Sequence, residues 1–260
     1  MESEILFSRK QQFGAVCAEI TLNRPEKGNA LTVQMLEQLG AIVSEIEADR
    51  ELRVVVLRAR GRFFCTGGDI GVWGSLSPQE MGRDWIHYGI HIFERLAALP
   101  QPVIAAVSGH ALGGGLELAM AADLRVAVKS AKFGSPEVTL GMISGWMGIR
   151  RLAEIIGVGR ARHLMLLGTP ITAEVALEWG LITGLAEDAD DLQRQLNGWL
   201  EKLCANAPGA MALTKGILAT MHADLRHHHA SAAAQAMSTE DCKEGVQAFH
   251  EKRKPVFRNR

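Results

Sequence analysis

The architecture of this chain can be inferred from one stretch, IAAVSGHALGGGLELA at residues 104–119. Residues 103–107 are continuously apolar, as is typical of a strand that is covered on both faces. A glycine-rich turn follows at 109–115, and then a helix at 116–121 and a second strand at 124–128. A strand, a tight turn and a helix in this order predict one unit of an α/β fold with parallel strands.

The same alternation is visible upstream of this stretch. Strands are predicted at 16–22 and at 52–57, and between them Thr32 is placed to cap a helix with apolar residues at three-to-four spacing. A loop at 58–69 and a helix at 78–99 come next. The repetition indicates several successive units of one α/β domain.

The pattern changes after about residue 190, where the strand signals end. Three helices with apolar faces are predicted there: 192–204, 207–221 and 239–252. The chain is therefore expected to divide into a core at 1–190 and a helical region at 191–260 whose apolar faces need a partner surface. The three consecutive histidines at 227–229 are expected at a solvated helix edge.

The composition is that of an ordinary globular protein, with 47% hydrophobic and 22% charged residues. Because 28 basic residues balance 29 acidic ones, no large field of one sign attracts nucleic acid or an anionic membrane. The four cysteines lie far apart and lack metal-ligand spacing, which indicates buried or incidental thiols in a reducing compartment. Without a signal-peptide pattern or a run of ~18 apolar residues, we expect a cytoplasmic protein.

Two glycine-rich turns each follow an apolar strand, FCTGGDI at 64–70 and the turn at 109–115. The second is not a phosphate-binding loop, because Leu116 and Glu117 stand where Lys and Ser or Thr are needed. A glycine backbone can approach a ligand closely, and two N–H groups at such turns can form an oxyanion hole. Each turn alone is more typical of a tight connection between a strand and a helix.

Taken together, five motifs along nearly the whole chain resemble the enoyl-CoA hydratase/isomerase (crotonase) superfamily. They are LNRPEKGNAL at 22–31, FCTGGDI at 64–70, the stretch at 104–119, FGSPE at 133–137 and EGVQAFHEKRKP at 244–255. The resemblance implies an α/β spiral of ββα units followed by a helical trimerisation region, in a homotrimer or homohexamer. It also implies hydration of an α,β-unsaturated acyl-CoA thioester to a 3-hydroxyacyl-CoA, as in fatty acid metabolism, through an enolate that the oxyanion hole stabilises.

The resemblance implies the catalytic residues by their positions in these motifs. Gly68 and Gly114 would supply the two backbone N–H donors, and Glu117 and Glu137 the two acid-base groups. Gly145 keeps a position whose N–H is associated with the catalytic water. Since alanine is common in the family where Gly68 stands, Gly68→Ala is expected to be tolerated.

The resemblance also implies which residues bind the CoA part of the substrate. They are Lys27, Ala30, Thr66, Gly67, Asp69, Ile70, Phe249 and Lys252. The last two would act on a neighbouring subunit, where a cation can meet a CoA phosphate and an aromatic ring can pack near adenine. No cofactor beyond the CoA of the substrate, no metal, no nucleic acid and no membrane partner is expected.

The segment GMISGWMG at 141–148 departs from the family pattern. Trp146 and Met147 place bulk where small residues are common, so the acyl pocket is expected to be reshaped. Double-bond isomerisation and hydrolysis stay open as other reactions of the superfamily, although two glutamates favour hydration over a single-acid isomerase. Two other classes are a catalytically silent assembly subunit and an RNA-binding member, the latter suggested by the basic end at 252–260.

Overall fold

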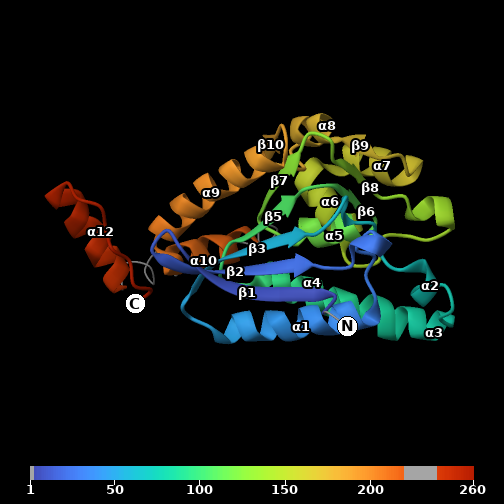
Figure 1. The fold of residues 1–260 in the computed structure, drawn as a ribbon, viewed down its shortest axis with the longest axis horizontal. Coiled ribbons are helices and arrows are strands. Elements are labelled where there is room, and N and C mark those ends of the chain that lie inside the picture. The colour runs from blue at the N-terminus through green and yellow to red at the C-terminus, as the bar shows by residue number, and fades with distance from the viewer. Residues whose placement is uncertain (1–2, 220–238) are drawn as a thin grey trace.

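The computed structural model describes residues 3–219 and 239–260, with two β-sheets at the centre (Figure 1). The larger sheet has six strands in the order β1-β2-β3-β5-β7-β10, and the smaller sheet has four in the order β4-β6-β8-β9. The strands are β1 (Ile5–Gln12), β2 (Ala15–Leu22), β3 (Leu52–Ala59), β4 (Phe63–Cys65), β5 (Val103–Val107), β6 (His110–Leu112), β7 (Leu124–Val128), β8 (Lys132–Gly134), β9 (Ile171–Thr172) and β10 (Gly184–Ala186).

Helices lie on opposite sides of the larger sheet, with α1 and α4 together on one side and α9 on the other (Figure 1). The α-helices are α1 (Val33–Ala48), α2 (Ile70–Trp73), α3 (Pro78–Glu80), α4 (Tyr88–Ala98), α5 (Gly114–Met120), α6 (Gly148–Ile156), α7 (Val158–Leu167), α8 (Ala173–Glu178), α9 (Ala189–Ala205), α10 (Pro208–Leu218) and α12 (Glu240–Glu251). Shorter helical segments are η1 (Pro25–Lys27), η2 (Met81–His87) and η3 (Glu137–Leu140).

Three successive passes of the chain each add one strand to each sheet. β3 leads into β4, β5 into β6 and β7 into β8, and in every case the first strand joins the larger sheet and the second joins the smaller one. From β2 to β10, neighbouring strands of the larger sheet run parallel, so that Ile104 of β5 lies beside Val56 of β3 and Leu124 of β7. Helices return the chain between passes. This arrangement is the expected spiral of ββα units.

The expected strands begin with β2, but the structure adds β1 before it. β1 pairs antiparallel with β2, with Ile5 opposite Leu22. The turn between them contains Phe13 and Gly14, whose φ angles of 51° and 76° are the positive values that a two-residue hairpin turn requires. Residues 8–12 are all polar, so β1 lacks the alternation of apolar and polar residues by which an edge strand is recognised.

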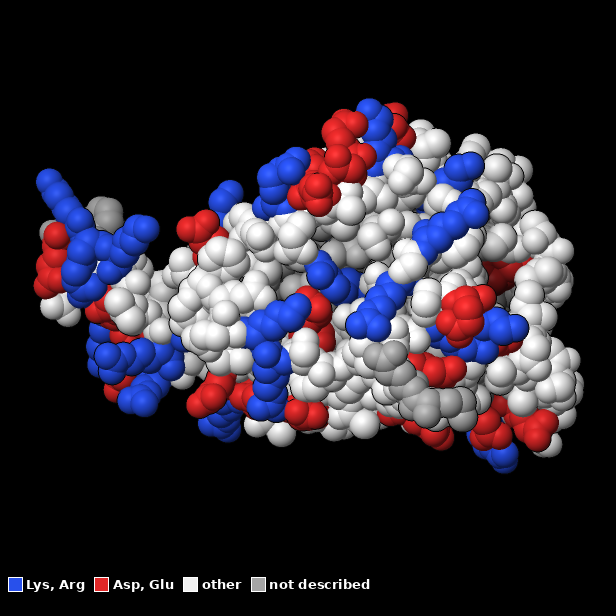
Figure 2. Space-filling model, in the orientation of Figure 1, with Lys and Arg blue, Asp and Glu red and all other residues white. Residues whose placement is uncertain are grey.

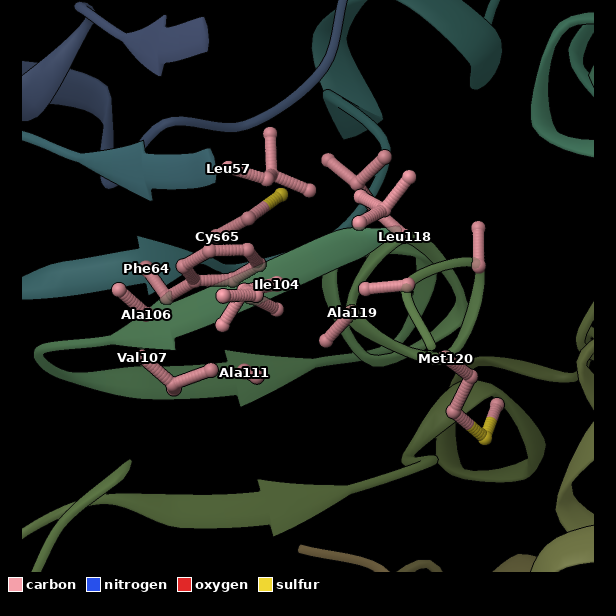
Figure 3. Packing of buried hydrophobic residues seen from close by; sticks show 14 of the residues in the cluster. Leu57, Phe64, Cys65, Ile104, Ala106, Val107, Ala111, Leu118, Ala119 and Met120 are labelled. Carbon is pink, nitrogen blue, oxygen red and sulfur yellow. The ribbon is translucent and has the colours of Figure 1, made fainter. Parts of the chain in front are cut away.

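The core beneath the glycine turns brings α5 close to the sheets. All seven residues of α5 are buried, and Figure 3 shows Leu118 of this helix in one cluster with Phe64 of β4 and Ile104 of β5. A Cβ atom on Gly115 would lie 2.2 Å from the carbonyl oxygen of Cys65. Only glycine at this position therefore allows α5 to approach β4 this closely.

The helix expected at 78–99 is irregular at its centre, because α3 and α4 are joined by the π-helical segment η2. A capping box between Ser77 and Glu80 fixes the beginning of the helix. Within η2, Trp85 is 4% exposed and points into the core. A π turn shifts the buried face relative to a 3.6-residue period, so apolar periodicity could not reveal it.

The C-terminal region is helical as expected, but α9 belongs with the core. Leu192, Leu196 and Leu200 of α9 are buried, and the helix contacts β3, β7 and β10. The expected division at 190/191 therefore falls inside a core helix, whereas α12 lies apart from the body of the chain (Figure 1). The histidines at 227–229 lie outside the described residues. Within the described ranges, no helix is both long and apolar enough to cross a bilayer.

Candidate active site

Two backbone amides from the two glycine-rich turns lie side by side. Gly114 is the first residue of α5, so its N–H has no acceptor within the helix. Gly68 forms a parallel bridge with Leu31, in which the N–H of Leu31 donates to Gly67 and the N–H of Asp69 donates to Leu31, both at 2.8 Å. The N–H of Gly68 itself is thus directed to the other side. A Cβ on Gly114 would lie 3.5 Å from the nitrogen of Gly68, which places the two amides together as an oxyanion hole requires.

Three tryptophans enclose these two glycines. A Cβ on Gly68 would lie 2.8 Å from Trp85 and 3.1 Å from Trp73, and a Cβ on Gly114 would lie 2.5 Å from Trp146. Trp85 and Trp146 are buried and pack on each other with ring centroids 5.0 Å apart, so neither can move aside easily. The close approach of these rings argues against the expectation that Gly68→Ala is tolerated, because a Cβ would force Trp85 to shift.

Glu117 is a buried carboxyl group that is held by two backbone amides. It is 4% exposed, and its Oε1 accepts hydrogen bonds from the N–H groups of Trp146 at 2.7 Å and Gly148 at 2.8 Å. Burial, and after it the charge of Glu137, raises the pKa of Glu117 from 4.5 to about 7, against the lowering effect of the two N–H donors. A carboxyl group with this pKa can accept or release a proton near neutral pH.

Glu137 reaches the same region from η3, directly after β8. Its Oε2 accepts a hydrogen bond from the hydroxyl of Ser135 at 2.8 Å, and its Oε1 accepts one from the hydroxyl of Ser144 at 3.0 Å. A Cβ on Gly113 would lie 3.3 Å from Oε1 of Glu137, so the carboxyl group borders the glycine turn at the start of α5. Two elements far apart in the sequence thus bring the two glutamates to one site.

The amides and carboxyl groups line one cavity of about 100 Å³. Its polar part consists of the two glycine turns and the two glutamates, and its apolar part comes from α2, η2 and the segment at 140–146. The apolar lining residues are Ile70, Trp73, Met81, Trp85, Ile86, Leu140, Met142, Ile143 and Trp146. A small apolar pocket that ends in two N–H donors and two carboxyl groups fits an acyl chain whose carbonyl oxygen points at the amides.

Comparisons with known proteins cover nearly the whole chain. The profile of the enoyl-CoA hydratase/isomerase family matches residues 12–260. The chain belongs to this family. A short-chain-enoyl-CoA hydratase from Clostridium acetobutylicum is 39% identical over 94% of this chain and 95% of its own length. A crotonyl-CoA hydratase from Syntrophomonas wolfei is 34% identical over 92% of this chain and 94% of its own.

The fold is likewise that of the enoyl-CoA hydratase/isomerase family. The crystal structure of enoyl-CoA hydratase from Bacillus anthracis superimposes with a TM-score of 0.93 at 34% identity, covering 99% of this chain and 100% of that one. The family and the spiral fold expected from the sequence are thereby confirmed, and with them the expectation of an enzyme of the enoyl-CoA hydratase class.

Several residues that the family resemblance assigns to CoA lie at the mouth of this cavity. Thr66, Gly67 and Ile70 line it, and Ile70 is 55% exposed. Asp69 instead caps α2 through the N–H of Gly71 and forms an ion pair with Arg24 at 2.7 Å. The hydrogen bond from Arg24 is the main cause that lowers the pKa of Asp69. Asp69 therefore holds the turn that carries Gly68.

The other residues expected to bind CoA lie in two separate parts of the structure. Lys27 is exposed at the end of η1, and the carbonyl of Ala30 accepts a hydrogen bond from Arg24 at 2.9 Å. Figure 1 places α12, which contains Phe249, at the end of the molecule opposite α2 and α3; the side chain of Phe249 lies outside the described part. Lys252 is exposed just after α12. Lys252 is not among the described residues that line the cavity of its own chain.

The structure brings the two glutamates expected from the sequence to one cavity, but the groups that hold them were not expected. Gly145 lines the cavity, yet the amides that bind Glu117 are those of Trp146 and Gly148. The role of Ser144 beside Glu137 carries no signal in a single sequence, since serine is common in loops. The bulk of Trp146 was the one visible signal, and it marks a cavity wall.

Proposed function

We propose that this protein adds water to an α,β-unsaturated acyl-CoA thioester and forms a 3-hydroxyacyl-CoA. The observation that carries the proposal is the convergence of two glutamates from separate elements on the cavity where two backbone amides lie together. Family membership and the names of the hydratase relatives support an acyl-CoA substrate. The CoA is part of the substrate, and the reaction requires neither a redox cofactor nor a metal.

In the proposed reaction, a carboxylate removes a proton from water while the water oxygen forms a bond to the β-carbon. The electrons of the double bond move toward the thioester carbonyl, and its oxygen becomes an enolate oxygen that the N–H groups of Gly68 and Gly114 stabilise. A carboxylic acid then donates its proton to the α-carbon, and the carbonyl forms again. One carboxyl group loses a proton and the other gains one, so water is added overall.

We assign the base to Glu117 and the acid to Glu137. Oε1 of Glu117 is bound by two N–H groups, which only donate, and such donors stabilise a carboxylate. Its pKa of about 7 matches the task of a base that works near neutral pH. Glu137 is instead surrounded by hydroxyl groups, which can donate to a carboxylate or accept from a carboxylic acid.

The acyl part of the proposed substrate is short. A cavity of about 100 Å³ is closed by Trp146, which is 2% exposed, and by Trp85 beside it. This volume is small compared with the roughly 300 Å³ or more of pockets for drug-sized ligands, so it fits a chain of few carbon atoms. The names of the Clostridium and Syntrophomonas relatives, which refer to short-chain-enoyl-CoA and crotonyl-CoA, support the same size class.

A panel of enoyl-CoA thioesters of increasing chain length tests the proposal, with loss of the conjugated thioester absorbance as the readout. We expect hydration of the shortest members. Glu117→Gln and Glu137→Gln keep the size of each side chain but cannot exchange protons, so each should lower kcat by about 10² or more. Wild-type protein that leaves every thioester of the panel unchanged would contradict hydration.

The isomerase alternative predicts a different outcome for these variants. An isomerase moves one proton between two carbon atoms and can do so with a single carboxyl group. Near wild-type turnover by Glu137→Gln, with a shifted double bond as the product, would support that reaction instead.

The RNA-binding alternative has little support from the charge distribution. Figure 2 shows Lys and Arg interspersed with Asp and Glu over the body, and basic side chains that gather at the end where α12 lies. Arg253 in that segment pairs with Glu244 and Glu251, so part of this basic charge is already compensated within the chain.

A further inference from the structure

Four oxygen atoms of three side chains form a closed ring at Glu137. The hydroxyl oxygen of Ser135 lies 2.8 Å from Oε2 of Glu137, and that of Ser144 lies 3.0 Å from Oε1. The two hydroxyl oxygens are themselves 2.7 Å apart. Ser135 precedes η3 and Ser144 lies in the loop before α6, so two separate segments place hydroxyl groups on one carboxyl group.

Counting protons shows what this ring can do. It has three short oxygen contacts, and the two serine hydroxyls supply two protons. When Glu137 is a carboxylate, both hydroxyls can donate to it, and the contact between the serines then carries no proton. When Glu137 carries a proton, it can donate to Ser144, Ser144 to Ser135, and Ser135 back to the other carboxyl oxygen. Rotation of two hydroxyl groups thus adapts the ring to either state.

We propose that Ser135 and Ser144 are positioning residues that hold the Glu137 carboxyl group in place both before and after it donates its proton. The inference rests on the proposed acid role of Glu137. A general acid changes from a hydrogen-bond donor to an acceptor during the reaction, and a fixed N–H partner could serve only one of these states. A pair of hydroxyl groups serves both states without any movement of heavy atoms.

The surroundings of the ring favour this role. Ser135 is 4% exposed and Ser144 is 8% exposed, so little water can replace the hydroxyl groups. Behind the ring lies an apolar cavity of about 280 Å³ between η3, α6 and α7. The charged groups that face Glu137 are Glu117 across the active-site cavity and Arg162 of α7 in the wall of the apolar cavity.

Steady-state hydration kinetics on a short enoyl-CoA test the proposal. Ser144→Ala and Ser135→Ala should each lower kcat by about tenfold or more while KM changes by less than about twofold, because the acid is misplaced and binding of the thioester is not. Ser144→Thr restores a hydroxyl, and its extra methyl group can enter the apolar cavity, so it should recover most of kcat. Thr139→Val is the matched control, since the hydroxyl of Thr139 in η3 donates only to the carbonyl of Pro136.

A double-mutant cycle separates positioning from a general structural effect. If the serines act through Glu137, Ser144→Ala should change kcat by less than about twofold in a Glu137→Gln background. An equal loss of kcat in both backgrounds, or Ser144→Ala and Ser135→Ala proteins with native circular dichroism and unchanged kcat, would overturn the positioning role. If one serine variant fails to fold, the other serine variant and Ser144→Thr decide the matter. Wild-type turnover by Glu137→Gln would instead reject the acid role on which the inference rests.

Discussion

The tryptophans around position 68 leave room only for glycine there. Trp85 and Trp73 occupy the space that a Cβ would need, so Gly68→Ala must displace a buried ring. We expect this variant to lower the free energy of unfolding by roughly 1 to 3 kcal/mol, as overpacking does, and to reduce hydration by moving the amide. Gly68→Ala combined with Trp85→Phe should recover part of both losses. A single variant with wild-type Tm and wild-type kcat would show that the rings yield freely.

The amide of Gly114 can be tested by removing its N–H. Gly114→Pro has no donor, so it should lose about 10² to 10³ in kcat, whereas Gly114→Ala keeps the N–H but collides with Trp146. Gly114→Ala in a Trp146→Phe background is therefore the proper control. Proline variants with native circular dichroism and native kcat would assign the oxyanion hole to other residues.

The raised pKa of Glu117 links folding stability to pH. Because its pKa is 4.5 in ordinary surroundings and about 7 in the folded protein, the folded state holds this proton more tightly than the unfolded chain. The resulting stabilisation is complete below pH 4.5, declines as pH rises, and is lost above about pH 7; it is at most about 3 kcal/mol. The Tm of wild-type protein relative to Glu117→Gln should therefore fall between pH 5 and pH 8 at fixed protein concentration. A constant difference would contradict a shifted pKa.

Protonation of Glu117 should affect activity in the opposite direction from stability. If Glu117 is the base, it must be ionised, so kcat/KM should decrease as pH falls below about 7. An acidic limb near pH 4.5 would place the working group elsewhere.

At the residue scale, the sequence predicted which groups gather at the cavity but not which groups hold them there. The family resemblance could locate the candidate site residues because each one lies within a short, continuous sequence motif. These residues are Gly68, Gly114, Glu117 and Glu137. The partners of Glu117 lie 29 and 31 residues further on, and no local pattern connects them. Long-range contacts of this kind depend on the fold of the whole chain.

At the scale of elements, one wall of the acyl cavity is built from η2 and the loop before α6, with α4 packed behind it. Trp146 donates to the carbonyl of Trp85 at 3.2 Å and packs on Phe93 of α4 with ring centroids 5.2 Å apart. Trp146→Ala should therefore enlarge the cavity and raise kcat/KM for longer enoyl-CoA substrates relative to the shortest one, at a stability cost of roughly 3 to 5 kcal/mol. Trp179→Phe, at a ring packed on His163 instead, is the control. If a folded Trp146→Ala protein keeps the same preference for chain length, then this wall does not determine which acyl chains the enzyme accepts.

The elements that sequence periodicity located well are those with regular spacing. β5 and β7 agree with expectation because each is a short apolar run, and α1 agrees because its apolar residues repeat with the period of a helix. η2 and β1 differ because a π turn changes the period and a polar edge strand has almost none. Local regularity, more than element length, decided what could be predicted.

At the scale of the whole molecule, α12 lies at the end opposite α2 and α3, and the segment after it is joined to the body by a hydrogen bond from Arg53 of β3 to the carbonyl of Phe257 at 2.8 Å (Figure 1). Phe249 in α12 and Lys252 just after it are the two residues expected there to bind CoA. Because α12 and the cavity lie toward opposite ends of the chain, we expect Phe249 and Lys252 to contribute to the CoA site of another copy. We therefore propose a homotrimer, or a homohexamer of two trimers, in which this segment completes the site of a neighbour. The backbone N–H groups of Arg258 and Asn259 donate hydrogen bonds to the buried carboxylate of Asp241, at 2.6 Å and 2.7 Å, which fixes the end of the chain against α12 and gives the segment a defined shape.

Deletion of residues 239–260 tests this assembly and CoA binding together. Light scattering should show that the truncated protein forms an oligomer of fewer subunits, and its KM for enoyl-CoA should be higher, because assembly and CoA binding depend on the same segment. Lys252→Ala separates the two effects: it should keep the oligomer mass, since Lys252 is exposed, and raise KM by about tenfold through loss of one phosphate contact. Mixing Lys252→Ala protein with Glu117→Gln protein should then produce hybrid oligomers in which an intact catalytic site meets an intact neighbouring segment. Recovery of a low KM in such hybrids is expected only if the segment acts between subunits, and hybrids with no recovery would confine Lys252 to its own chain.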